Sequence, residues 1–186
     1  MKNRVIILLL LSSLLTSCIA VVVAGAAGMV VYDRRSVRMI ESDARIFYTI
    51  NKAIVSNPQF RQSHIVVSSF NHAVLLVGQT STMSLRNLAE IISKNTPKVQ
   101  RVYNEMTIQP STSLTQRSQD TWITGQVRAS MLAQKGLESG SIRVVTENSV
   151  VYLLGIATHE QANLAVQVAR QVNGVSKVVK VFNYIG

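Results

Sequence analysis

Apolar residues recur every four positions in two separate stretches of the chain. These residues are Ile46, Ile50 and Ile54 in the first stretch, and Ile123, Val127 and Met131 in the second. Such spacing places each set on one face of a helix. Asp43 and Asp120 lie three residues before the two sets, and an aspartate oxygen can accept the free amides of a first helical turn. The pattern predicts two amphipathic helices with Asp43 and Asp120 as N-caps.

Each predicted helix is followed by two short apolar runs that are separated by turn-forming residues. The runs are 65–69 and 73–78 around Asn71-His72, and 142–146 and 150–155 around Asn148-Ser149. Apolar runs of this length on either side of a two-residue turn are typical of antiparallel hairpins.

A second helix and a last strand complete the pattern in each stretch. The apolar face of the helix is Leu85, Leu88, Ala89 and Ile92 in the first stretch. In the second stretch, Thr158 and Gln161 have the spacing of a capping box, and Asn173-Gly174 ends the helix before the valine-rich strand 175–184. A helix between two strands makes a crossover, so the second and third strands should be parallel. The result is a mixed sheet with both helices on one face.

The two stretches are copies of one unit. Residues 43–78 align with residues 120–155 at a constant offset of 77, and after one deletion the offset becomes 76. The fold class is therefore α+β, with two tandem αββαβ domains that each have a three-stranded sheet. We place the first domain at 42–109, a polar linker at 110–117 and the second domain at 118–186. The predicted interior residues are Ile46, Ile50, Leu76, Ile92 and Val102, and Ile123, Val127, Leu153, Val166 and Val178.

The chain begins with the features of a lipoprotein signal peptide, which we place at residues 1–17. Lys2 and Arg4 precede an apolar run, and Leu15-Thr16-Ser17-Cys18 has the pattern of a lipobox with the only cysteine of the chain. Cleavage would leave a lipidated Cys18 and a tether over residues 18–41. The alternative is an uncleaved membrane-spanning helix, since residues 19–31 are also apolar. Gly25-Ala26-Ala27-Gly28 favours the tether, because small residues are poor membrane filler.

Charge and chemistry narrow the class of function. The net charge of +10 falls by two, to +8, when Lys2 and Arg4 are removed, and it is spread over both domains. Such a field favours anionic lipid headgroups in an exported protein, and no interleaved aromatic residues or reading motif indicate nucleic acid. The three histidines, His64, His72 and His159, lack ligand partners at metal-binding spacing. Glu41 and Asp43 form the closest acidic pair, and Asp43 is already assigned as a cap. We therefore expect no enzyme activity, no metal site and no cofactor.

Several motifs carry a family resemblance. The strands Val74-Leu75-Leu76-Val77-Gly78 and Val151-Tyr152-Leu153-Leu154-Gly155 both end in glycine, and Asp120-Thr121-Trp122-Ile123-Thr124 is a specific string. With the lipobox and the repeat, they resemble the DolP family of outer-membrane lipoproteins with two BON domains. Asn148-Ser149 departs from the Asn-Gly turn that is more frequent in that family, and this weakens the case for a type I′ turn there.

The resemblance implies an outer-membrane lipoprotein that faces the periplasm and has no enzymatic role. It also implies support of envelope integrity, binding of anionic phospholipid by the second domain, and association with division sites and the outer-membrane assembly machinery. Ile19 and Ala20 agree with outer-membrane sorting, since neither is the aspartate that retains many lipoproteins in the inner membrane. The lipid would be phosphatidylglycerol or cardiolipin.

The helix that contains Trp122 is the candidate lipid-binding element. With the apolar stripe facing the core, Trp122, Gly125, Ala129 and Leu132 fall on the solvent side, and Arg128 and Lys135 border them. The first copy has Arg45 in place of Trp122, so the repeated core does not require a tryptophan. These six residues form the predicted phospholipid site. The alternative is that Trp122 is a wedge between the two domains.

Two classes of function remain open. The first is a lipid-binding module that recognises an anionic membrane through its second domain. The second is a periplasmic adaptor that recruits the outer-membrane assembly machinery or a regulator of cell-wall amidases without recognising lipid.

Overall fold

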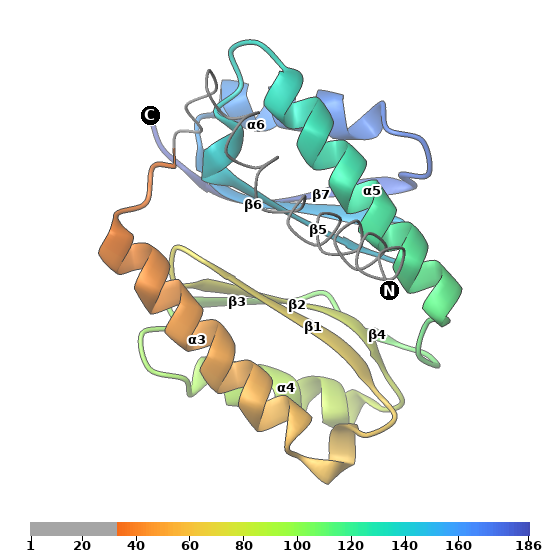
Figure 1. The fold of residues 1–186 in the computed structure, drawn as a ribbon. Coiled ribbons are helices and arrows are strands. Elements are labelled where there is room, and N and C mark those ends of the chain that lie inside the picture. Colours follow the sequence, from red (N-terminus) through yellow and green to blue (C-terminus); the bar gives the residue numbers. More distant parts are fainter. Residues whose placement is uncertain (1–32) are drawn as a thin grey trace, which may run out of the picture. The chain divides into compact units, whose positions relative to one another are not determined.

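The computed structural model describes residues 33–186 and contains two helix-hairpin-helix-strand units (Figure 1). The first unit consists of α3 (Val37–Val55), β1 (His64–Phe70), β2 (Ala73–Thr80), α4 (Met83–Lys94), β3 (Arg101–Asn104) and β4 (Thr107–Ile108). The second consists of α5 (Leu114–Ala133), β5 (Ile142–Glu147), β6 (Val150–Ala157), α6 (His159–Arg170) and β7 (Lys177–Tyr184). The predicted signal peptide, Cys18 and most of the tether lie outside the described residues.

The sheet topology follows the prediction in both units. β1 pairs antiparallel with β2, and β2 pairs parallel with β3; β5, β6 and β7 repeat this arrangement. One detail differs from the predicted three strands, because the last strand of the first unit is interrupted at Glu105-Met106 and β4 pairs separately with β2. Arg86 of α4 stabilises the irregular backbone between the two strands by donating hydrogen bonds to the carbonyls of Asn104 and Met106.

Both hairpins close through two-residue turns with a left-handed backbone. Asn71 and His72 have φ values of 51° and 61°, and Asn148 and Ser149 have values of 50° and 62°. Positive φ at both central residues defines a type I′ turn, so Asn148-Ser149 adopts this turn without a glycine. The glycines that end the family motif have a different role. A Cβ on Gly78 would lie 2.0 Å from the His64 carbonyl oxygen, and one on Gly155 would lie 2.6 Å from that of Ser141.

The predicted N-caps are wrong, and the first helix of each unit begins earlier. Ser36 and Ser113 are the N-caps of α3 and α5, and their side chains accept from the amides of Met39 and Gln116. Residues 37–41 and 114–117 are therefore helical, although the sequence assigned them to the tether and the linker.

The two aspartates instead hold the hairpin turns. Asp120 is buried and accepts the amides of Asn148 and Ser149, both at 2.8 Å. Asp43 is buried in the same way, and it accepts the amides of Asn71 at 2.7 Å and His72 at 2.9 Å. Each carboxylate thus fastens the turn between two strands to the helix that packs on them.

Each unit has its own core between its helices and one face of its sheet. The predicted helical stripes, together with Leu76, Leu153 and Val166, are buried as expected. Ile92, Val102 and Val178 are only partly buried and pack at the edge of these cores.

A third apolar cluster lies between the two sheets. Its buried members are Phe70, Leu75, Val77, Tyr152, Leu154 and Val181. Burial, with contributions from Glu105 and Glu147, raises the pKa of Tyr152 to about 12. Each sheet is therefore covered by helices on one face and by the other sheet on the opposite face, which leaves the helices on the outside (Figure 1).

A polar network closes one end of this interface around the buried Glu147. Gln79 donates a hydrogen bond of 2.7 Å to Glu147 Oε1, and His64 Nε2 lies 3.3 Å from Oε2. Burial alone would raise the pKa of Glu147, but the hydrogen bonds from His64, Gln79 and Thr112 outweigh it and hold the pKa below its usual range. The ionised carboxylate thus links residues of both units.

The predicted capping box at α6 is only half formed. Thr158 is the N-cap and accepts from the amide of Gln161. The Gln161 side chain, however, turns to the loop after α5, where it accepts from the Glu138 amide and donates to the Gly136 carbonyl. Gln161 therefore ties the end of α5 to α6.

Replacement of Asp120 with alanine tests the turn clamp. Removal of the carboxylate leaves two amides and the Gln116 side chain without their acceptor, so we expect a loss of about 1.5 to 3 kcal/mol in the free energy of unfolding. The measurement is urea denaturation of Asp120→Ala beside Thr121→Ala, an exposed neighbour that should change stability little. Equal stability of the two variants would contradict the clamp.

Replacement of Leu153 with alanine tests the orientation of β6. Leu153 is fully buried in the core of the second unit, so truncation should cost about 2 to 5 kcal/mol through lost transfer energy and a residual cavity. Thermal and urea unfolding of this variant would measure the loss. A change below about 1 kcal/mol would show that Leu153 does not face the core.

Candidate functional site

The α5 helix carries five of the six residues that the sequence predicted as the site, and Lys135 lies just beyond its end. Trp122, Gly125, Arg128, Ala129, Leu132 and Lys135 are all exposed. Trp122 is 54% exposed to solvent and Leu132 is 44% exposed, although both side chains are large and apolar. Ile123, Val127 and Met131 point into the core on the opposite side of the helix, and this fixes the direction of the exposed face.

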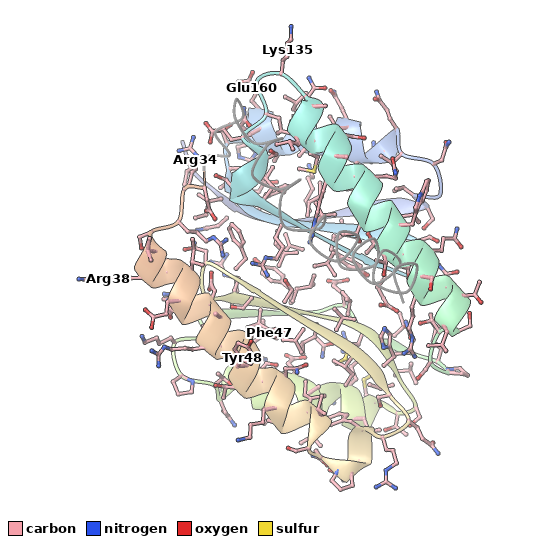
Figure 2. The ribbon with its side chains drawn as sticks, in the orientation of Figure 1. Arg34, Arg38, Phe47, Tyr48, Lys135 and Glu160 are labelled. Atoms are coloured by element: carbon pink, nitrogen blue, oxygen red, sulfur yellow. The ribbon has the colours of Figure 1, made fainter. Side chains whose placement is uncertain are left out.

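The two predicted basic residues occupy different positions. Arg128 projects from α5 toward the edge of the second sheet, where it donates a 3.1 Å hydrogen bond to the Val144 carbonyl. Lys135 does not lie on the helical flank as predicted, because α5 ends at Ala133 and Gln134 has an extended backbone. Figure 2 shows Lys135 at that end of the helix, directed away from the protein.

The structure adds two residues that the sequence analysis missed. Leu114 in the first turn of α5 is 78% exposed, and Arg117 follows it on the flank that also carries Arg128. Both were assigned to the linker because the helix was predicted to begin at Asp120. Ser113 is followed by an exposed apolar residue and is a good N-cap type, so it is the feature that could have indicated the true start.

The exposed surface of α5 has no negative charge. Asp120 is the only acidic residue between Leu114 and Ala133, and its buried carboxylate is occupied by the hairpin amides and Gln116. Arg117 and Arg128 are therefore the only charged side chains that this helix presents to its surroundings. The combination is an apolar strip with a basic border.

The equivalent helix of the first unit differs at the same positions. The outermost residues of α3 include Glu41, Arg45 and Lys52, where α5 has Ser118, Trp122 and Ala129. Glu41 and Arg45 form an ion pair of 2.7 Å. Apolar residues flank this charged line, and Val37, Tyr48 and Val55 are all more than 70% exposed. Figure 2 labels Tyr48 on this helix.

Trp122 borders a surface groove of its own unit. The groove is lined by Trp122, Gln126 and Ser130 of α5, by Val168 of α6, and by Gln171, Val172 and Asn173 just after α6. Trp122 is not among the residues that pack between the sheets. The alternative to a lipid contact, a wedge of Trp122 between the two domains, differs from this position.

The three histidines have structural neighbours. His64 meets Glu147, the His72 ring lies 2.9 Å from the Ser42 hydroxyl, and His159 stacks on Tyr184. Within residues 33–186, no group of three or more His, Cys, Asp or Glu side chains comes together as a metal site would require. No helix in the same range combines the length and the apolar content needed to cross a bilayer.

Comparisons with known proteins identify the two units. The BON domain model matches residues 42–110 and again residues 119–186. The chain is 33% identical over 170 residues to the outer membrane lipoprotein DolP of Haemophilus influenzae. This alignment covers 90% of this chain and 88% of that protein. It is also 35% identical over 143 residues to a 21 kDa hemolysin of Actinobacillus pleuropneumoniae, covering 77% of this chain and 72% of the relative.

Among solved structures, the chain is similar to CdsD, a structural protein of the type III secretion system of Chlamydia trachomatis. The sequence identity is 13% and the TM-score is 0.31, over 77% of this chain and 63% of that one. The two BON matches and the long alignment with DolP are much more specific. The chain belongs to the DolP family and is an outer-membrane lipoprotein with two BON domains.

Proposed function

We propose that the second BON domain binds anionic phospholipid through the outward face of α5. The observation that carries this proposal is an exposed apolar strip, centred on Trp122, with a basic border and no exposed acid. The lipid would be phosphatidylglycerol or cardiolipin in the membrane that holds the lipid anchor. This binding would support envelope integrity, with division sites as the place of action.

The chemistry of the strip suits the boundary between headgroups and acyl chains. The indole of Trp122 is amphipathic and favours the headgroup level, whereas Leu132 can enter the apolar boundary. Gly125 and Ala129 lie between them, and their small side chains allow the helix to approach the bilayer closely. Arg128 would meet lipid phosphates, and each basic residue near an anionic surface contributes about 1 kcal/mol.

A second candidate function is a protein-binding adaptor, and one observation favours it. Val37, Tyr48 and Val55 of α3 are exposed beside a line of charged residues, a mixture that suits a protein partner better than a lipid. Candidate partners are the outer-membrane assembly machinery and regulators of cell-wall amidases. Lipid binding by α5 and protein binding by α3 use different helices, so both can operate.

Replacement of Trp122 with glutamate tests the lipid site. A carboxylate in the middle of the strip is repelled by anionic headgroups, so the affinity for phosphatidylglycerol vesicles should fall by about tenfold or more. Vesicle flotation and circular dichroism would report binding and folding. Tyr48→Glu on α3 is the matched control, since Tyr48 is 71% exposed and lies on the equivalent helix.

The two variants also distinguish lipid binding by α5 from an adaptor function without lipid affinity. Lipid recognition by α5 predicts loss of binding for Trp122→Glu, with an unchanged melting temperature, and normal binding for Tyr48→Glu. Normal binding by Trp122→Glu would remove α5 as the lipid site. A protein adaptor without lipid affinity would show no preference for phosphatidylglycerol over neutral vesicles in any variant.

Replacement of Cys18 with alanine tests the predicted anchor. Cys18 is the only cysteine, and its thiol is the proposed attachment point for lipid, so the variant should neither be cleaved nor incorporate labelled palmitate. Metabolic labelling and gel mobility would measure both effects. Palmitate incorporation by the Cys18→Ala protein would refute the lipobox assignment.

A further inference from the structure

We propose that residues 33–35, where the predicted tether meets α3, act as a strap that holds the two domains in their docked arrangement. These residues precede α3, so the covalent chain joins them to the first domain only. Their hydrogen bonds, however, reach both domains. The strap acts on the interface between the domains and does not depend on lipid binding by α5.

Arg34 is bonded to the second domain, in the connection between α5 and β5 (Figure 2). Its guanidinium donates to both carboxylate oxygens of Glu138, at 2.7 and 2.9 Å, and its amide donates to the Ser141 hydroxyl at 3.0 Å. An arginine that meets both oxygens of a carboxylate forms the strong and directional kind of ion pair. The two side chains are 30% and 35% exposed, so water screens this pair only in part.

Arg35, the next residue, is bonded to the first domain. Its guanidinium donates to Asp43 at 2.9 Å and to Asp33 at 2.8 Å, and its side chain is only 6% exposed. It also lies over the Phe70 ring, with 3.8 Å between Cζ and the ring centroid. Phe70 belongs to the apolar cluster between the two sheets. The strap therefore touches the domain interface itself.

The linker makes an equivalent contact in the other direction. At the repeat offset of 77, Ser111 takes the place of Arg34. The Ser111 hydroxyl donates a 2.8 Å hydrogen bond to the Gln62 carbonyl, which lies between α3 and β1 of the first domain. The segment before the first helix of each domain thus bonds the connection before the first strand of the other domain.

Only one of these two crossings is required by the order of the chain. The linker must run from one domain to the other, whereas the tether precedes both domains and has no such constraint. Ser141 directly precedes β5 and Glu147 ends it, so the strap and the Glu147 network fasten opposite ends of the same strand. Two fastenings restrain rotation of one domain about the other. They also mean that the tether joins the folded protein beside the second domain.

Buried cysteine reporters distinguish undocking of the domains from unfolding. A chain that begins at residue 19 keeps every described residue and contains no cysteine. Val77→Cys places a thiol in the cluster between the sheets, whereas Val74→Cys and Val127→Cys place one in the separate cores of the first and second domains. All three valines are fully buried. A thiol reagent labels the reporter at 77 when the sheets separate, and it labels the core reporters only when a domain opens.

Replacement of Arg34 with alanine should loosen the interface without unfolding either domain. We expect labelling of Val77→Cys to become about three- to fivefold faster, and labelling of both core reporters to stay unchanged. An unchanged rate at Val77→Cys would overturn the strap. An equal acceleration at all three thiols would overturn it as well, since the contact would then stabilise a domain and not the docking.

Two further tests show whether the contact is specific. Arg45→Ala is the matched control, because it breaks the 2.7 Å ion pair with Glu41 inside the first domain and should leave labelling of Val77→Cys unchanged. The same acceleration by Arg45→Ala as by Arg34→Ala would reduce the effect to general charge and overturn the strap.

Reversal of the ion pair completes the test. Arg34→Glu should speed labelling of Val77→Cys more than Arg34→Ala does, because the new carboxylate faces Glu138. Addition of Glu138→Arg should bring the rate back close to that of the unmodified pair. A reversed pair that labels as fast as Arg34→Glu alone would show that Arg34 and Glu138 do not hold the domains together.

Discussion

The fold of each domain depends on one buried carboxylate that joins a helix to a hairpin turn. Asp43 and Asp120 each accept both amides of a type I′ turn, and these donors have no partner within the turn itself. The helix is thereby held at one position along its sheet, with the apolar stripe over the strands. Because that stripe sets the rotation of the helix, the clamp also determines which residues of α5 point outward.

Contact between the sheets makes the helices the exposed layers of the protein. Val66, Leu75 and Val77 meet Tyr152 and Leu154 on the faces that lack helices, and Glu147 joins the two domains at one end. Central strands that are buried on both faces lose the alternation of apolar and polar residues, as Val74-Leu75-Leu76-Val77 shows. That run and its counterpart Val151-Tyr152-Leu153-Leu154 were the indication in the sequence that a second apolar surface covers each sheet.

The strands, the helical stripes and the repeat could be predicted because each depends on local periodicity. The helix starts were missed, because an aspartate three residues before an apolar stripe has the same pattern whether it caps its own helix or reaches a distant turn, and the aspartates were preferred to the true N-caps Ser36 and Ser113. That error placed Leu114 and Arg117 in the linker, so these two residues of α5 were missed. The Gln161 side chain failed as a capping residue for a similar reason, since its partners at Gly136 and Glu138 are distant in sequence.

Duplication of one fold gives the two domains the same frame and allows different outer surfaces. A membrane contact tolerates an indole at the centre of the helix but not a row of charged side chains such as Glu41, Arg45 and Lys52. The free energy needed to remove water from these charged groups exceeds the free energy gained by burying the nearby valines. The substitution of Trp122 and Ala129 at two of these places removes that cost without disturbing Ile123 or Val127 beneath them. Since the sheets pack between the helical layers, a bilayer against α5, as proposed, would leave α3 exposed. Its tyrosine and valines would then stay accessible to the proposed protein partner.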